Sequence, residues 1–352
     1  MIDVRRAGRQ ARWLLASTLL ATTLACTSED PALAPPPPPT GDTAQARVLV
    51  VNTLSETLSS LDLGSGRMSV NAAVVGTWAN RVAAMPGGQL LLVTDSGSNE
   101  VEVLAASTLA HLRSIDVGAG RNPWTTKPLD AARALVTNWL GSEARVLQVP
   151  SGSLGRAIPT TVGPEGFASA GQRAYVACSN FGGTPGSFGE GRLDVIDASA
   201  QEVIASVAVG RNPQDVAIAA DGRVHVLCTG DYAGIEPGRV DVVDPSSLAV
   251  VGTVPLGGSP ERVAAGPDGA MWTVGFQGGL RRYDPSTLAV LGDPVDPQLT
   301  GPLSAIAVDG TSNTVYVTAF DDDRLLAVDG TTRLVTNTWQ VGDGPVDVIV
   351  LR

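Results

Sequence analysis

The stretch DVVDPSS at residues 241–247 sets the pattern that organises this 352-residue chain. Alternating apolar residues that end at an aspartate predict a β-strand, and the Asp-Pro-Ser that follows predicts a tight turn capped by the aspartate carboxylate. Related segments occur at residues 194–197 (DVID), 284–287 (DPST) and 329–332 (DGTT). The sequence therefore repeats one structural unit.

A Val-Gly or Leu-Gly step marks the period of this unit. The steps are 41 to 47 residues apart and lie at Gly76, Gly118, Gly163, Gly210, Gly257, Gly342 and, in weaker form, Gly301. Short segments with period-two alternation lie between the steps, and no helical period persists after residue 46. Four antiparallel strands per repeat predict one blade of a β-propeller.

The two ends of the repeat region predict how the blades close. The first repeat, residues 47–75, has three strands and lacks the innermost one, while the C-terminal GPVDVIV at 344–350 matches the innermost strand NPQDVAI at 212–218. We therefore predict an all-β fold over residues 47–352, a seven-bladed β-propeller of four-stranded antiparallel blades closed by the C-terminal strand completing blade one. Two separate domains are the alternative.

Three of the repeated strands carry a family resemblance. Residues 93–95 (VTD), 136–138 (VTN) and 316–318 (YVT) resemble the YVTN family of β-propeller repeats, which has lactonase-like fold relatives. The resemblance covers residues 47–352 and implies the propeller fold, but it implies no single activity. The catalytic sets of propeller lactonases and of streptogramin lyases do not map onto this chain, so we place no catalytic residue.

The N-terminal segment resembles a bacterial lipoprotein signal. Four arginines precede an apolar run at residues 13–25, which ends in TLAC at 23–26, so residues 1–25 are expected to be removed and Cys26 to be lipidated. An ordinary signal-peptidase site and an uncleaved anchor are the alternatives. Residues 26–46 include five consecutive prolines and predict an extended linker. We expect an exported protein that is lipid-anchored to the bacterial cell envelope, at the outer membrane or cell surface.

Composition narrows the function classes. The chain has 24 basic and 35 acidic residues and a net charge of −11, which disfavours nucleic-acid binding. Two histidines and three cysteines leave little for metal or haem ligation, so no metal and no cofactor are expected. The acidic run at residues 321–323 is expected to form a solvated hairpin tip rather than a calcium site. We expect a monomer whose only membrane contact is the lipid anchor.

Aromatic residues gather in the loops that are expected on one face of the propeller. The eight residues in these loops are Trp78, Trp124, Trp139, Phe181, Phe188, Tyr232, Phe276 and Phe320. Exposed aromatic side chains suggest a recognition surface, whereas packing between blades is the alternative.

Charged residues form a column at the start of the innermost strands. The column contains Arg81, Asp215, Arg262 and Asp347, with Glu165 and Glu261 just before it. Arg81 and Arg262 could hold a ligand carboxylate in bidentate fashion. Mutual pairing between arginines and aspartates around the ring is the alternative.

The remaining reactive residues do not form a catalytic set. Cys178 and Cys228 end the second strands of neighbouring blades and are expected to be buried free thiols, with a disulfide as the alternative. His225 is expected to be packed within a strand, and His111 begins an outer strand. We therefore expect a non-catalytic module that binds a protein, small-molecule or glycan ligand through its loop face. A lactonase- or lyase-like enzyme acting at the channel mouth is the alternative.

Overall fold

The computed structural model describes residues 46–184, 186–292 and 295–352, which form strands and one short 3-10 helix, η1 (Pro297–Leu299). The predicted signal peptide, Cys26 and most of the proline-rich linker lie outside the described residues. Within the described part of the chain, no helix has the length and apolar character needed to cross a membrane.

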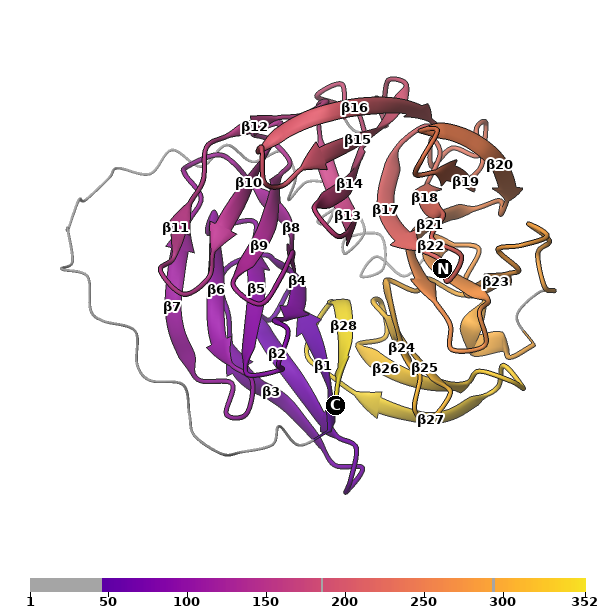
Figure 1. The fold of residues 1–352 in the computed structure, drawn as a ribbon. Coiled ribbons are helices and arrows are strands. Elements are labelled where there is room, and N and C mark those ends of the chain that lie inside the picture. Colours follow the sequence, from indigo (N-terminus) through magenta and orange to yellow (C-terminus); the bar gives the residue numbers. More distant parts are fainter. Residues whose placement is uncertain (1–45, 185, 293–294) are drawn as a thin grey trace. The chain divides into compact units, whose positions relative to one another are not determined.

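Seven antiparallel sheets follow one another around a ring (Figure 1). Blade 1 contains β28 (Pro345–Leu351), β1 (Arg47–Asn52), β2 (Thr57–Asp62) and β3 (Met68–Val74). Blade 2 contains β4 (Ala79–Ala84), β5 (Leu90–Asp95), β6 (Glu100–Ala105) and β7 (His111–Asp116). Blade 3 contains β8 (Pro123–Pro128), β9 (Arg133–Asn138), β10 (Glu143–Gln148), β11 (Ser153–Leu154) and β12 (Ile158–Pro159).

The other four blades follow the same order from the innermost strand outward. Blade 4 contains β13 (Pro164–Ala170), β14 (Arg173–Cys178), β15 (Gly191–Asp197) and β16 (Glu202–Val209). Blade 5 contains β17 (Pro213–Ile218), β18 (Val224–Cys228), β19 (Arg239–Asp244) and β20 (Ala249–Pro255). Blade 6 contains β21 (Ser259–Ala265), β22 (Met271–Gln277) and β23 (Arg281–Tyr283). Blade 7 contains β24 (Ala305–Asp309), β25 (Thr314–Ala319), β26 (Arg324–Asp329) and β27 (Val335–Gln340).

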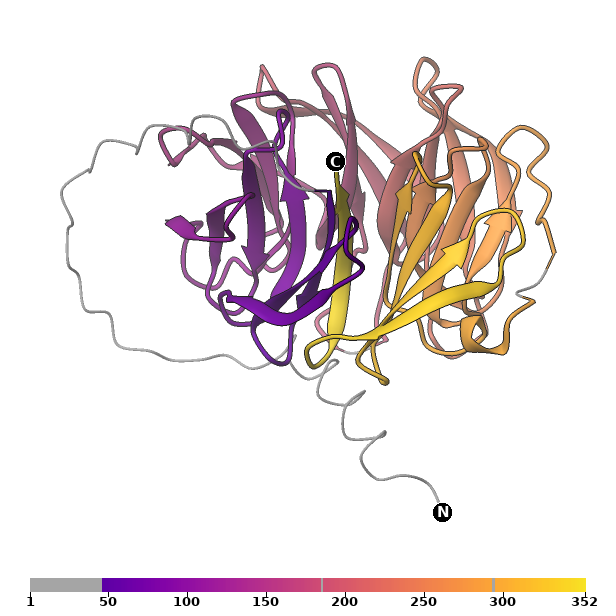
Figure 2. The same ribbon diagram turned by 90° about the horizontal axis from the view of Figure 1, so that it is seen from below.

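The C-terminal strand closes the ring, as predicted. β28 pairs antiparallel with β1, and Val348 lies opposite Val50 in the register. Figures 1 and 2 show the C-terminal strand beside the first strand of the described chain. Blade one is therefore built from both ends of the repeat region: β28 covers the edge of β1 and becomes the innermost strand of the blade.

The outermost strands of two blades depart from the regular pattern. In blade 3 this strand is broken into β11 and β12, which both pair with β10. In blade 6 the fourth strand is reduced to a single bridge between Tyr283 and Val290. An outermost strand has one neighbour within its blade, so it can break with the loss of few ladder hydrogen bonds.

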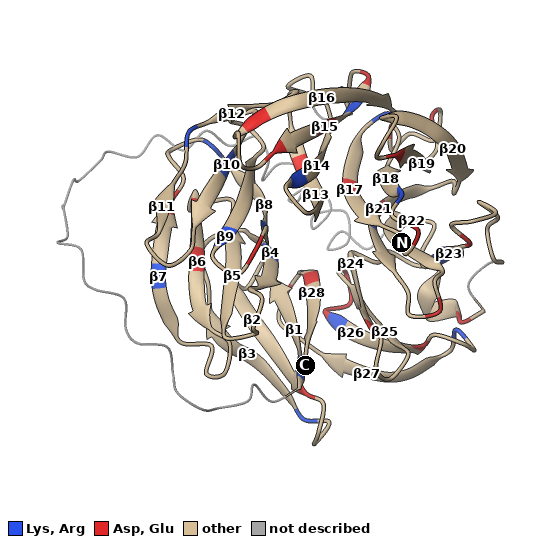
Figure 3. Cartoon of the chain, viewed as in Figure 1, with Lys and Arg blue, Asp and Glu red and all other residues tan. Residues whose placement is uncertain are grey.

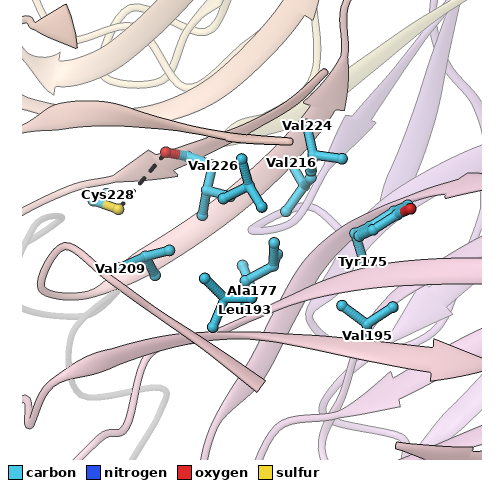
Figure 4. Close-up of a cluster of buried hydrophobic side chains, with 11 residues drawn as sticks. Tyr175, Ala177, Leu193, Val195, Val209, Val216, Val224, Val226 and Cys228 are labelled. Carbon is cyan, nitrogen blue, oxygen red and sulfur yellow. Dashed lines mark hydrogen bonds between the residues drawn. The ribbon is translucent and has the colours of Figure 1, made fainter. Parts of the chain in front are cut away.

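Valine-rich cores lie between adjacent blades. All five residues of β18 are buried, because both faces of a middle strand are covered by neighbouring sheets. Figure 4 shows the cluster shared by blades 4 and 5, which includes Tyr175, Leu193 and Val224. The Cys228 thiol points into this packing and lies 3.6 Å from the Val226 carbonyl oxygen.

The predicted aspartate turns are present as hydrogen-bonded caps. The Asp244 carboxylate accepts the backbone N–H groups of Ser246 at 2.9 Å and Ser247 at 2.7 Å. Asp284 and Asp329 cap their own turns in the same way. These bonds hold the pKa of Asp244 below its usual value.

Candidate functional site

Two kinds of loop meet at one end of the blades. In each blade the innermost strand begins beside the end of the second strand; Pro213, for example, pairs with Cys228. The loop between the second and third strands and the loop between blades therefore share one face, which we call the loop face. All of the predicted aromatic and charged site residues lie in these loops or on the strands that they join.

Five aromatic side chains form a continuous series of ring contacts across blades 3, 4 and 5. Ring centroids are 5.6 Å apart for Trp124 and Trp139, and 4.9 Å apart for Trp139 and Phe181, which stack. The series continues from Phe181 to Phe188 at 5.8 Å and from Phe188 to Tyr232 at 6.4 Å. We call these five residues the aromatic row.

The long loop after β14 holds the middle of the aromatic row. Phe181 and Phe188 form an isolated antiparallel bridge, and the N–H of Gly182 donates to the Ser187 carbonyl at 2.7 Å. Asn180 begins this small hairpin with a φ of 51°, a left-handed conformation that asparagine tolerates well. The loop therefore presents both phenylalanines in a defined geometry.

The remaining predicted aromatics lie outside the row. Phe276 and Phe320 form an edge-to-face pair at 5.7 Å between blades 6 and 7. Trp78 lies against Gly97 in blade 2, where a Cβ on that glycine would be 3.1 Å from the indole ring. The sequence pattern predicted eight aromatic residues on one face. In the structure they form a row of five, a pair and a single tryptophan.

Burial within the aromatic set is uneven. Phe320 is fully buried and Trp139 is 7% exposed, so these two pack as interior residues. Phe181, Phe188 and Tyr232 are half-buried and keep part of each side chain accessible. The Trp139 Nε1–H finds no hydrogen-bond acceptor among the residues that the structure describes. The row thus contains accessible ring surface and one unused donor.

Arg81 and Arg262 lie on innermost strands at the centre of the ring, and both are almost completely buried. One Nη of Arg81 donates to the Asn80 carbonyl at 3.2 Å, and one Nη of Arg262 donates to the Glu261 carbonyl at 2.8 Å. The second Nη of Arg81 and the Nε of Arg262 have no acceptor within the described part of the chain. Burial and the positive charge of Arg262 lower the pKa of Arg81 to about 10.

The two aspartates of the column connect neighbouring blades. Asp347 of blade 1 accepts the backbone N–H of Val82 in blade 2 at 2.9 Å. Asp215 of blade 5 accepts the N–H of Val263 in blade 6 at 3.2 Å. Figure 3 shows acidic and basic segments on the inner strands around the centre. These carboxylates thus have a structural role, in addition to their attraction for Arg81.

Two buried glutamates lie beside the arginines. Glu165 is 3% exposed and Glu261 is 1% exposed. Burial raises the pKa of Glu165 to about 8 and that of Glu261 to about 7, although both arginines counteract this effect. Carboxyl groups with pKa values near neutrality can exchange protons with a bound molecule.

Tyr232 joins the aromatic row to the central charges. Its hydroxyl group accepts a hydrogen bond from Gln214 Nε2 at 2.7 Å and donates to Glu261 Oε1 at 3.3 Å. Since the Arg262 guanidinium donates to the Glu261 backbone carbonyl, a series of contacts extends from the half-exposed rings to Arg262. The charge of Arg262 in turn acts on Arg81. The column and the aromatic loops were separate features in the sequence, and Tyr232 provides the contact between them.

Lys127 is a central residue that sequence reasoning missed. Its Nζ donates to the Phe167 carbonyl at 2.9 Å and lies 3.9 Å from Asp215 Oδ1, while 38% of the side chain is exposed. Burial lowers the pKa of Lys127, and repulsion from the positive charges of Arg81 and Arg262 adds to this effect. The signal in the sequence was its position on the innermost strand β8, four residues after Pro123.

His225 lies in the middle of β18, whereas Cys178 and Cys228 end β14 and β18 at the edge of the loop face. His225 is fully buried, its Nδ1 lies 2.9 Å from the Tyr283 hydroxyl, and burial lowers its pKa to about 4. Cys178 and Cys228 are buried free thiols, as expected from the spacing between blades, and burial raises the pKa of both.

Comparisons with known proteins support the architecture. No protein-family model matches the chain, and no curated protein matches it. Among solved structures, the chain is similar to hydrazine synthase of Kuenenia stuttgartiensis, with 18% identity, a TM-score of 0.66, and coverage of 80% of this chain and 92% of that one.

Two further structures share the fold. A streptogramin B lyase has 14% identity and a TM-score of 0.62, with 77% of this chain and 86% of that chain covered. A Bacteroides fragilis protein named for 6-phosphogluconolactonase activity has 14% identity and a TM-score of 0.69, with 89% and 100% covered. At such low identity these similarities show the propeller fold, whose neighbours include lactonase- and lyase-like proteins, and they do not carry a function.

Proposed function

We propose that this protein is an envelope-anchored binding module whose loop face holds an acidic ligand from the cell envelope. The ligand would carry a carboxylate group and a flat apolar or sugar surface. The observation that carries the proposal is the connected path from the aromatic row through Tyr232 to Arg81 and Arg262. Buried guanidinium N–H groups without acceptors favour a carboxylate, and accessible aromatic rings favour a planar or apolar partner.

The lipid anchor is part of this proposal and rests on residues 1–26 of the sequence. Attachment through Cys26 would hold the propeller at the envelope by its proline-rich linker. Metabolic labelling of cells with a fatty acid tests the anchor. The mature protein should incorporate the label, and a Cys26→Ser variant should not. Equal labelling of both proteins would contradict the proposal.

An enzymatic function is the second candidate, and the two central glutamates favour it. Glu165 and Glu261 have pKa values raised towards neutrality and adjoin two arginines, a combination suited to proton transfer near a bound carboxylate or lactone. The fold similarity to a streptogramin B lyase and to a protein named for 6-phosphogluconolactonase activity agrees with this candidate.

Capture of small molecules and glycans from envelope extracts by the mature protein, followed by affinity measurements, tests the binding proposal. Phe188→Ala and Arg262→Gln should each weaken the captured ligand about tenfold or more, the loss typical of a central contact. Two controls on outer strands, Trp339→Ala in β27 and Arg113→Gln in β7, should retain full affinity.

The same experiment separates the two candidates. If the protein only binds its ligand, the captured ligand is recovered unchanged. If the protein is an enzyme, the wild type and the outer-strand variants convert the ligand to a product, and Glu165→Gln does not. Equal affinity of the loop-face and outer-strand variants would contradict both, because each depends on the loop face.

A further inference from the structure

Three carboxylates converge in blade 2, away from the central charges. Asp95 ends β5, and Glu100 and Glu102 lie on β6; Asp95 and Glu100 are directly opposite in the register. Each of the three offers an oxygen atom, and these oxygens all lie within 4.8 Å of one another. Asp95 is fully buried, Glu102 is 8% exposed and Glu100 is half-buried. We call these residues the acidic trio.

The carboxylates of the acidic trio lack the partners that buried acids normally have. Among the described residues, no hydrogen-bond donor reaches either carboxylate oxygen of Asp95 or the Oε2 atom of Glu102. The charges that act on Asp95 are those of Glu102, Glu100 and Glu56, all acidic. Burial and these like charges raise the pKa of Asp95 to about 9, and burial with Glu100 raises that of Glu102 to about 7. Unpaired buried carboxylates are strongly unfavourable, so the negative charge of this group must be neutralised, either by bound protons or by a cation.

The equivalent place in blade 3 shows how an acid is normally satisfied here. Glu143 occupies the position of Glu100 and accepts hydrogen bonds from Asn138 Nδ2 at 3.2 Å and Arg145 Nε at 2.9 Å. Asn138 and Arg145 occupy the positions of Asp95 and Glu102. Blade 3 therefore surrounds one carboxylate with two donors, where blade 2 has three carboxylates.

Blades 4 and 5 give the same result with the acid at the position of Glu102. Asp194 accepts the Thr161 N–H at 2.6 Å and the Ser206 hydroxyl at 2.6 Å. Asp241 accepts the Arg239 guanidinium at 2.9 Å. Each of these carboxylates has protein donors, so the lack of donors in blade 2 is a local feature and does not follow from the architecture.

We propose that Asp95, Glu100 and Glu102 form a binding site for a divalent cation of the calcium type. Carboxylate oxygens are the ligands that calcium prefers, and the absence of histidine and cysteine from the trio disfavours zinc. Three carboxylates can supply up to about six oxygens, within the six to eight that calcium takes. Glu100, which is half-buried, gives the ion access from solvent.

The backbone at Gly76 packs closely against the acidic trio. A Cβ on Gly76 would lie 2.8 Å from Asp95 Cγ and 2.9 Å from Ser98 Oγ, so only a glycine fits at this position beside the carboxylate. Ser98 Oγ also accepts the Thr77 N–H at 2.9 Å, which ties the turn after β5 to the loop between blades 1 and 2. A bound cation would therefore stabilise the blade 2 part of the loop face.

The test uses the full chain, freed of metal with a chelator and titrated with calcium chloride alone. Calorimetry should detect one site, and saturating calcium should raise the melting temperature by about 3 °C or more. Asp95→Asn and Glu102→Gln should weaken calcium binding about tenfold or more, while Glu143→Gln in blade 3 should keep the wild-type affinity. Because each trio variant removes a buried negative charge, both should fold without metal.

If a trio variant does not fold, Glu100→Gln at the more exposed position provides the second measurement and should also bind about tenfold more weakly. The proposal is overturned if the wild-type protein shows neither binding heat nor a melting shift. It is equally overturned if the three trio variants bind calcium as tightly as Glu143→Gln does, because the cation would then lie elsewhere.

Discussion

Replacement of Val348 by alanine tests the ring closure with a small and local change. Val348 lies opposite Val50 in the β28–β1 ladder, is 3% exposed, and packs in a cluster that also contains Tyr316 and Leu325. The substitution removes two buried methyl groups and leaves a cavity between blades 1 and 7. At about 0.8 kcal/mol for each buried methyl-sized group plus a cavity contribution, the free energy of unfolding should fall by roughly 2–3 kcal/mol.

Equilibrium unfolding in urea, followed by far-UV circular dichroism, measures this loss. Val74→Ala is the matched control, because Val74 is 78% exposed at the end of an outermost strand. Its free energy of unfolding should change by no more than about 0.5 kcal/mol. If Val348→Ala lost no more stability than Val74→Ala, the C-terminal strand would not be part of the core and would not close the ring in solution.

Three further predictions concern buried polar groups. Burial raises the pKa of Glu165 from 4.5 to about 8, so between these pH values the folded state keeps a proton that the unfolded state releases, and the stability contributed by this group falls as pH rises. Between pH 5 and 8, Glu165→Gln should therefore lose less stability than the wild type in urea unfolding. An identical pH dependence of the two proteins would contradict the raised pKa. Tyr283→Phe removes the hydroxyl group bound to His225 and should lower the free energy of unfolding by about 1–2 kcal/mol, whereas no loss would show that the bond is absent in solution. In a Cys26→Ser background, Cys178 and Cys228 should resist a thiol reagent in the native protein, and both should react after denaturation. Rapid reaction of either cysteine in the native protein would contradict their burial. Failure of both cysteines to react after denaturation would contradict the free thiol state.

Backbone architecture was predictable because it depends on local rules that repeat. Period-two alternation, turns capped by aspartate and the match between residues 344–350 and 212–218 each follow from short sequence patterns. The structure confirms the seven blades and the closing strand. The breaks in the outermost strands of blades 3 and 6 were not predicted, because those strands have few partners and their pairing is weakly specified by sequence.

Side-chain arrangement at the site was less accessible from the sequence. The aromatic residues were all expected in loops, but Trp124 lies in β8 and Phe276 in β22. Ring contacts such as that between Phe188 and Tyr232 depend on loop conformations that no periodic pattern fixes. Lys127 was overlooked because it lies outside the charged column. The acidic trio was visible in principle, since aligning residues 95–102 with 138–145 shows Asp95 and Glu102 where blade 3 has donors.

Site-specific photo-cross-linking in the native envelope tests directly whether the loop face binds the ligand. A benzoylphenylalanine at Phe188, in the aromatic row, is compared with one at Val250, which is 40% exposed on the outer strand β20. If the loop face binds the ligand, a discrete ligand adduct forms at position 188 and none forms at position 250. Adducts at position 250 alone, or in equal yield at both positions, would contradict binding at the loop face.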